Sequence, residues 1–272
     1  MSRYLLVSLL LLGGSVGWIW SAPTPGRTNS PSAQLLLEVA LPAPGAYQAN
    51  KDRLFALTSV GKTDLNRYAD RGEPQTRLRD MLHRAQLLLW ATTPMTPPRA
   101  LQAEVVQLKR EFRGSMVLID RIPIPTTPQA EKQLKDRVLA SCKQLARTIA
   151  NLETLADELQ EARPLRDKEN LRWQAHYDLI LAWVQHRIVY LEELNLALGG
   201  LRKELPAYDA VVHKTYRLDT REVLRDVPSR KRYREAEKVL QQVAKDHPDT
   251  IWAELAQQAM KMHLGVEWQA VK

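Results

Sequence analysis

The sequence has a single cysteine, Cys142, so no disulfide bond can form within the chain. Cys142 lies far from the N-terminus, which excludes the lipid-modified cysteine that follows a lipoprotein signal. Its neighbours Val138, Leu139 and Leu145 are apolar at helical positions, and this setting predicts a small buried side chain. The chain also lacks a His-Glu-x-x-His pair, which places two zinc ligands on one helical face. The sequence therefore predicts no catalytic site, no metal site and no cofactor.

Aromatic residues are scarce at 6%, whereas hydrophobic residues reach 44%, an ordinary fraction for a protein with a packed core. Lys and Arg number 39 against 31 Asp and Glu, which gives a formal net charge of +8. The two signs are interleaved over most of the chain, as is typical of solvated helix faces. The basic excess leaves a second interpretation open, which is contact with an acidic surface such as anionic lipid or polymer.

Residues 1–22 have the pattern of an export signal. Arg3 supplies the positive charge, residues 4–12 are mainly apolar, and small residues follow at 13–17. Cleavage would release the rest of the chain as a soluble protein. Retention would leave residues 4–20 as a membrane anchor, because their length is near the lower limit of about 17 residues for a bilayer span. Both outcomes predict an extracytoplasmic location, in the periplasm or cell envelope.

Residues 23–47 are rich in Pro, Gly, Ser and Ala and predict a spacer between membrane and folded body. Residues 48–126 form a mixed, mostly helical region. Within this region, apolar residues at helical spacing predict helices at 76–91 and 101–112. The run 116–119 favours a strand, and the prolines that follow confine it to an edge or loop.

Residues 127–205 predict a long helical hairpin. Its first helix starts at Thr127-Pro128, a typical cap and first residue, and its apolar stripe continues to about Glu161. A second stripe covers residues 167–198, and Gly199-Gly200 are expected to end it. Because neither helix can hide its stripe from water alone, we expect the two to pack antiparallel, as in a coiled coil.

Residues 206–228 predict a polar linker, and residues 229–272 predict a helical pair. The stretch YREAEKVLQQVAKDHPDTIWAELAQQAM resembles one tetratricopeptide-type hairpin, with Tyr233 and Ala236 on the first helix and Pro248 at the turn. A free-standing array needs about three repeats. The single unit is therefore expected to pack on the long helices instead of forming a peptide-binding superhelix.

A broader resemblance covers approximately residues 171–269. The stretches RWQAHYDLILAWVQHRIVYLEELNLALG and KDHPDTIWAELAQQAM, followed by LGVEWQ, are similar to the C-terminal helical region of exported, uncharacterised proteins of planctomycete bacteria. Some of these relatives carry a von Willebrand A domain upstream. Its Asp-x-Ser-x-Ser motif does not occur in this sequence, where Arg-Ile-Pro follows Asp120. The resemblance implies export and a helical C-terminal body, and it implies no activity.

Three other patterns have ordinary explanations. Residues 56–63 resemble a phosphate-binding loop, but Ala56 replaces its first glycine and the residues before it are charged and few for the required strand. The six histidines are scattered. The pair Glu192-Glu193 belongs to a charged helix pattern, for which we expect solvation instead of acid–base chemistry.

The densest basic patch consists of six residues: Arg221, Arg225, Arg230, Lys231, Arg232 and Arg234. One interpretation is a solvated loop and helix start. The other is docking to an acidic protein, an anionic lipid or an acidic polymer. Nucleic acid is not an expected partner, because the export signal places the patch outside the cytoplasm.

The sequence thus predicts a mainly α protein, with a small mixed N-terminal part, a long antiparallel hairpin and a tetratricopeptide-like helix pair. Its predicted function is that of an exported, non-catalytic scaffold or adaptor that binds an envelope protein. The alternative is an extracytoplasmic hydrolase, or a glycan- or polymer-binding protein, with its site in residues 48–126. Membrane contact is expected only through residues 4–20, and only if they are not cleaved.

Overall fold

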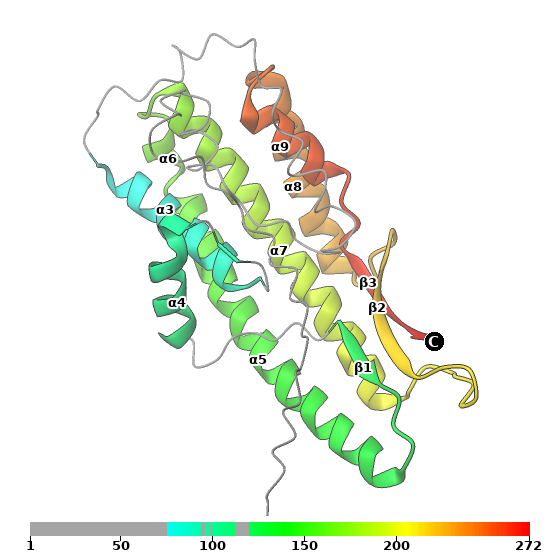
Figure 1. Ribbon diagram of the computed structural model, residues 1–272. Coiled ribbons are helices and arrows are strands. Elements are labelled where there is room, and N and C mark those ends of the chain that lie inside the picture. The colour runs from blue at the N-terminus through cyan, green and yellow to red at the C-terminus, as the bar shows by residue number, and fades with distance from the viewer. Residues whose placement is uncertain (1–74, 94–95, 98, 112–119) are drawn as a thin grey trace, which may run out of the picture.

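The computed structural model describes residues 75–93, 96–97, 99–111 and 120–272. Within them the protein is mainly α-helical, with one small three-stranded antiparallel sheet (Figure 1). The predicted mainly α fold is confirmed. The export signal, the spacer, the run 116–119 and the motif at 56–63 lie outside the described residues. None of the described helices is both long and apolar enough to cross a membrane.

Helices α5 (Pro128–Glu161) and α7 (Leu171–Lys203) form the predicted long hairpin and run antiparallel (Figure 1). Thr127 caps α5, because its hydroxyl accepts a hydrogen bond from the backbone N–H of Ala130 at 3.1 Å. Asn170 caps α7 in the same way. The short turn α6 (Arg163–Arg166) joins the two helices. The predicted stripe on α5 is buried and consists of Leu134, Val138, Leu145, Leu152, Leu155, Ala156 and Leu159.

Within the described residues two α-helices precede the hairpin, and both correspond to helices predicted from the sequence. Helix α3 (Arg77–Ala91) packs on α7 and, more lightly, on α5. After the single turn η3 (Arg99–Leu101), helix α4 (Gln102–Glu111) packs on α3. A small apolar cluster, separate from the main core, forms between α3 and α4 and consists of Trp90, Ala91 and Val105.

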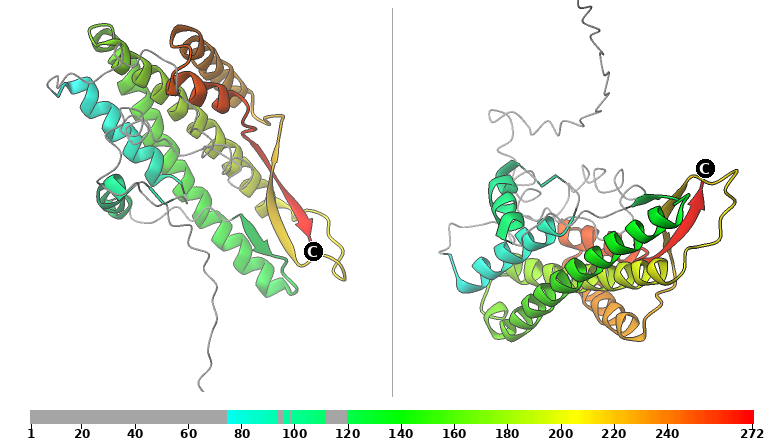
Figure 2. Two further views of the ribbon diagram at one scale, coloured as in Figure 1. Left: turned by 45° about the horizontal axis from the view of Figure 1, so that its top comes forward. Right: turned by 90° about the horizontal axis from the view of Figure 1, so that it is seen from below.

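The C-terminal helical pair consists of α8 (Val227–Asp246) and α9 (Ile251–Met260). The pair lies on the other side of α7 from α3 (Figures 1 and 2). Asp249 in the turn has a φ of 57°, a left-handed value that Asp tolerates better than most residues. Trp252 of α9 is fully buried. The pair is therefore part of the common core, as a single tetratricopeptide-like unit must be.

The sheet has the strand order β1-β2-β3, and both pairings are antiparallel. Its strands are β1 (Arg121–Pro123), β2 (Thr215–Arg221) and β3 (Gly265–Val271). Strand β2 lies within residues 206–228, which the sequence led us to interpret as a polar linker, and β3 follows the last helix. Only Tyr216 of β2 is fully buried, and apolar and polar residues alternate only over residues 216–219. This alternation is too short to distinguish the strand from a loop in the sequence.

Helix α7 is the centre of the fold. Helices α3, α5, α8 and α9 and strand β3 all pack against it. Its buried apolar side chains point in every direction, as Ile180, Trp183, Ile188 and Val189 show. A helix that is apolar all round is stable only when neighbouring elements enclose it. The packing of these five elements is therefore organised around α7.

The C-terminal end of α7 differs from the prediction. The sequence predicted an end at Gly199-Gly200, but the helix continues to Lys203 and its C-cap is Glu204. Each glycine costs about 1 kcal/mol relative to alanine in a helix. Burial of Leu201 in the following turn offsets this cost. The helix ends before Pro206, because the residue that precedes a proline avoids the α conformation.

The hairpin interface can be tested with two identical truncations at sites that differ only in burial. Leu152 is 0% exposed at the α5–α7 interface, whereas Leu196 on α7 is 44% exposed. Leu152→Ala is expected to lower the free energy of unfolding by about 2–5 kcal/mol, because it leaves a cavity. Leu196→Ala should change it by about 0.5 kcal/mol or less. Urea denaturation followed by circular dichroism measures both, and equal effects would contradict the packing.

Candidate functional site

The start of α8 is attached to α7 by a buried carboxylate. Glu193 is fully buried, and its Oε1 accepts hydrogen bonds from the backbone N–H groups of Arg225 at 2.7 Å and Asp226 at 3.1 Å. Asp226 then caps α8, because its Oδ2 accepts a hydrogen bond from the N–H of Ser229 at 3.0 Å. The backbone at this helix start is therefore fixed before any side chain of the basic patch is placed.

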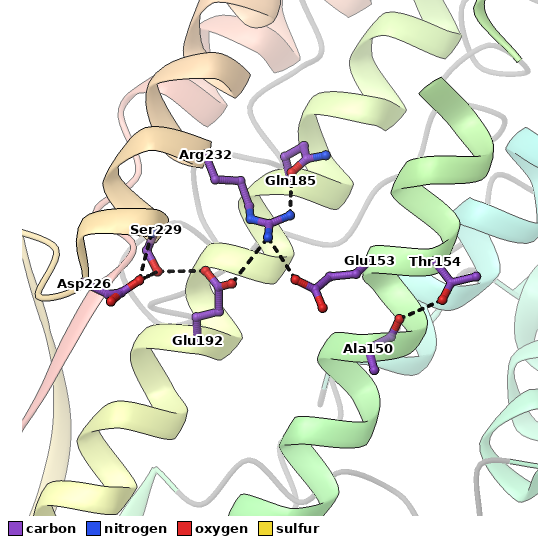
Figure 3. Close-up of polar contacts among 8 residues, drawn as sticks. All are labelled: Ala150, Glu153, Thr154, Gln185, Glu192, Asp226, Ser229 and Arg232. Carbon is purple, nitrogen blue, oxygen red and sulfur yellow. Dashed lines mark hydrogen bonds and ion pairs between the residues drawn. The ribbon is translucent and has the colours of Figure 1, made fainter. Parts of the chain in front are cut away.

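Ser229 connects two carboxylates beneath α8. Its buried hydroxyl lies 2.7 Å from Glu192 Oε2 and 3.2 Å from Asp226 Oδ2 (Figure 3). Burial raises the pKa of Glu192, while the Ser229 hydroxyl and the nearby Arg232 guanidinium act in the opposite direction. The Glu192 carboxylate is thus stabilised by partners from α8, although it belongs to α7.

Arg232 points inward and joins three helices (Figure 3). Its Nη2 lies 2.9 Å from Glu153 Oε1 on α5 and 3.6 Å from Glu192 Oε1 on α7. Its Nη1 donates a hydrogen bond to Gln185 Oε1 at 3.2 Å. Arg232 therefore belongs to the support of α8 and is not available to a partner.

Most other members of the basic patch remain on the surface. Arg221 pairs with Glu267 of β3 at 3.9 Å and is partly exposed. Four side chains are exposed and have no ion pair among the described residues: Arg225, Arg230, Lys231 and Arg234. Val223 and Val227 beside them are 58% and 66% exposed. We call these four cations and two valines the α8 basic face.

The geometry of the α8 basic face suits an anionic protein surface. Val227, Lys231 and Arg234 follow one another at spacings of four and three residues, so they share one side of α8. Guanidinium groups bind carboxylates through paired hydrogen bonds, and exposed valines add apolar contact. Because Glu193, Ser229 and Arg232 fix the helix from beneath, the face is preorganised for binding.

The sequence did not indicate that Glu192, Glu193, Ser229 and Arg232 hold the start of α8 against its neighbours. We expected Glu192-Glu193 to be solvated, and this expectation is wrong, because Glu193 is fully buried and Glu192 is half-buried. Only the triplet Asp226-Val227-Pro228 before a helical pattern signals the cap. Glu153 and Gln185 carry no sequence signal that connects them to α8, since the contact depends on tertiary packing.

The described residues contain no group of three or more His, Cys, Asp or Glu side chains placed to hold a metal ion. Two histidines of α7 are buried, and burial lowers the pKa of His176 to about 3 and that of His186 to about 4. His186 stacks on Tyr233 of α8 with ring centroids 5.2 Å apart. Both imidazoles are therefore neutral at pH 7. Cys142 is half-buried, and burial raises the pKa of its thiol.

The fold and this face define a mainly α protein with a rigid, exposed, cationic helix surface. A scan against protein-family models gives no match, and comparisons with curated proteins and with solved structures find no similar chain. The resemblance of residues 171–269 to exported planctomycete proteins therefore stays a prediction.

Two arginines on opposite sides of α8, Arg232 and Arg234, provide a matched test of the contacts that hold α8 on α5 and α7. Arg232→Met should lower the free energy of unfolding at pH 7 by about 1–3 kcal/mol, because it leaves Glu153 and Glu192 without their shared cation. Arg234→Met, on an exposed side chain, should change it by about 0.5 kcal/mol or less.

The effect of Arg232→Met is also expected to depend on pH. Loss of the cation matters while Glu192 is ionised, so the deficit should shrink as the pH falls through the pKa of Glu192, which burial raises above 4.5. Urea denaturation at pH 7 and pH 4 measures this. A deficit that stays constant with pH would show that Arg232 acts through packing alone.

His186 provides a separate pH prediction. The folded protein keeps this imidazole neutral down to about pH 4, whereas the unfolded chain protonates it near 6.5, so stability should fall as the pH drops between these values. His186→Phe keeps an aromatic ring beside Tyr233 and removes the titratable imidazole. The variant should lose less stability between pH 6.5 and 4 than the parent. His263→Phe, on an exposed side chain, is the control, and equal pH profiles for all three proteins would refute the assignment.

Proposed function

We propose that this protein is an exported, non-catalytic helical scaffold or adaptor that binds an acidic surface of another envelope protein through the α8 basic face. The observation that carries the proposal is the contrast between the two sides of α8. The inner side is neutralised by Glu153 and Glu192, whereas the outer side keeps four exposed cations and two exposed valines.

The arrangement favours binding in two ways. Because hydrogen bonds to Glu193 and Glu192 of α7 fix the start of α8, little conformational entropy is lost when its outer side meets a partner. The excess of exposed cations over the neighbouring Glu222 and Glu235 also accelerates encounter with an acidic surface and disfavours basic partners. An acidic protein suits this face better than lipid, since a lipid-facing helix needs a continuous apolar side, and the face has only Val223 and Val227.

The location in the proposal depends on residues 1–22, whose pattern is that of an export signal under either cleavage or anchoring. If the segment is retained, residues 4–20 attach the protein to the membrane and the Pro-rich spacer at 23–47 separates the helical body from it. The partner would then be an envelope protein within reach of that spacer.

The second candidate function is an extracytoplasmic hydrolase, or a glycan- or polymer-binding protein, with its site in residues 48–126, and different observations bear on it. Within that region, Thr92 accepts a hydrogen bond from the buried Arg187 of α7, and Lys109 contacts Thr93. His83 Nε2 also lies 2.9 Å from Glu104 Oε2 on the exposed surface of α3 and α4. The described residues of this region contain no group of three or more His, Cys, Asp or Glu side chains placed to hold a metal ion.

Charge reversal at two matched surfaces tests the proposed function. The first variant changes the four cations of the α8 basic face to Glu, and the control changes four exposed residues of α5 to Glu, namely Lys132, Arg137, Lys143 and Arg147. Both lower the net charge equally. We expect the α8 variant to bind polyglutamate, as a probe of an acidic protein surface, at least about tenfold more weakly, and the α5 variant to change binding much less. Equal losses would show that only net charge matters.

The same two variants distinguish a protein partner from a membrane. Vesicles that contain anionic phospholipid are the second probe, and binding to them should stay weak for all three proteins. A photoreactive residue at Val227 in the full-length chain should then crosslink to an acidic envelope protein in intact cells, and the α8 charge reversal should abolish the product. Strong, α8-dependent vesicle binding with no protein crosslink would replace the adaptor proposal with a lipid-binding one.

A further inference from the structure

Arg187 of α7 is a buried cation with few polar contacts. Its side chain is 2% exposed and lies against the C-terminal end of α3. The Nε group donates a hydrogen bond to Thr92 Oγ1 at 3.1 Å, and the guanidinium carbon lies 5.3 Å from the ring centroid of Tyr190. No carboxylate of the described residues pairs with Arg187, and its Nη2 has no hydrogen-bond acceptor there.

The remaining charge of Arg187 is substantial. Burial lowers its pKa to about 10, so the guanidinium is still protonated at neutral pH. A buried charge is costly unless an opposite charge or enough hydrogen bonds compensate it. The neutral hydroxyl of Thr92 and the Tyr190 ring compensate it only in part.

A second cation contacts the next residue of the chain. Lys109 of α4 donates a hydrogen bond from Nζ to the carbonyl oxygen of Thr93 at 3.4 Å, and burial lowers its pKa. It has no ion pair among the residues that the structure describes. Arg187 and Lys109 thus contact two consecutive residues, Thr92 and Thr93, from two different helices.

The C-terminal end of α3 accounts for part of this positive charge. A helix C-terminus carries about half a negative charge, and α3 has no basic residue of its own in its last turn. Arg187 and Lys109 therefore complement the dipole of α3. Two full positive charges exceed half a negative charge, so the dipole of α3 compensates them only in part.

The other end of α3 shows that the fold can supply a carboxylate where one is needed. There the buried Arg79 pairs with Glu169 through Nη2 at 2.9 Å and Nε at 3.3 Å. Arg187 lies on the same side of the molecule, in contact with the same helix, and has no such partner among the described residues. Of these two buried arginines, Arg79 therefore has a carboxylate partner and Arg187 has none among the described residues.

We propose that Arg187 and Lys109 bind a small carboxylate anion at the C-terminal end of α3. The guanidinium would provide the paired hydrogen bonds that a planar carboxylate accepts, and the Lys109 ammonium would add a second charge. Helix α4, which carries Lys109, contacts α3 through the small cluster of Trp90, Ala91 and Val105.

The site is independent of the α8 basic face. It lies on the α3 side of α7, whereas α8 lies on the other side (Figure 2). Charge reversal on α8 should leave carboxylate binding unchanged, so failure of one proposal does not imply failure of the other.

The test uses acetate as the probe, with the full chain kept at constant ionic strength by exchange against chloride. Acetate should raise the thermal unfolding midpoint in a saturable manner, because a ligand that binds only the folded state stabilises it. Arg187→Met preserves apolar volume and should weaken acetate binding at least about tenfold. Arg110→Met, on the exposed side of α4, should leave binding within about twofold of the parent.

Lys109→Met covers the case in which Arg187→Met fails to fold. It should weaken acetate binding severalfold while Arg110→Met does not, since only Lys109 contacts the end of α3. A methyl-labelled acetate signal that shifts with the folded parent protein provides a second readout. Absence of saturable stabilisation in the parent, or equal acetate binding by the Lys109→Met and Arg110→Met proteins, would overturn the proposal.

Discussion

Helix α7 must be enclosed, because its apolar side chains leave no side that water could solvate. This constraint explains why α5 alone cannot shield α7 from water. A two-helix hairpin covers one stripe, and α7 also buries Trp183, Val189 and Leu194. Helices α3, α8 and α9 and strand β3 cover the remaining directions. The tetratricopeptide-like pair is stable as a single unit for the same reason, since α7 replaces the neighbouring repeats that such a unit normally requires.

Enclosure of α7 determines what its polar side chains can do. A buried polar group needs a partner, and α7 carries several. Glu193 satisfies two backbone N–H groups before α8, Glu192 accepts the Ser229 hydroxyl and approaches Arg232, and His186 stacks on Tyr233. These contacts place α8 on α7 in one orientation, which apolar packing alone would not specify. The exposed side of α8 is a consequence of that orientation.

The elements that were predictable are those whose signals are local. Thr127-Pro128 and the stripe that follows specify α5 to within a residue at each end, because the cap and the 3.6-residue period both lie in the segment itself. The strands depend on distant residues instead. Tyr216 of β2 pairs with Ala270, far along the chain, and the alternation of apolar and polar residues in β2 covers only residues 216–219. The prediction that α7 ends at Gly199-Gly200 was wrong for a related reason. Burial of Leu201 against other elements outweighs the local tendency of glycine to end a helix.

The sequence predicted which basic residues cluster in this segment but not which of them are exposed. Arg232 and Arg234 both lie near the start of α8, but residues two positions apart point to opposite sides of a helix. Arg232 therefore contacts Glu153, whereas Arg234 is exposed to solvent. Composition cannot make that distinction before the neighbours of α8 are known.

The two sides of α7 also differ in how their charged side chains are compensated. On the α8 side every carboxylate has a donor from α8 or its preceding loop, whereas on the α3 side Arg187 has a hydroxyl and an aromatic ring. Since Arg79 and Glu169 show that α3 can be held by a neutralised pair, attachment of α3 does not by itself require a charged residue at position 187. A neutral side chain of similar volume would fill that space at lower cost, so the charge itself needs an explanation, and an anionic ligand provides one.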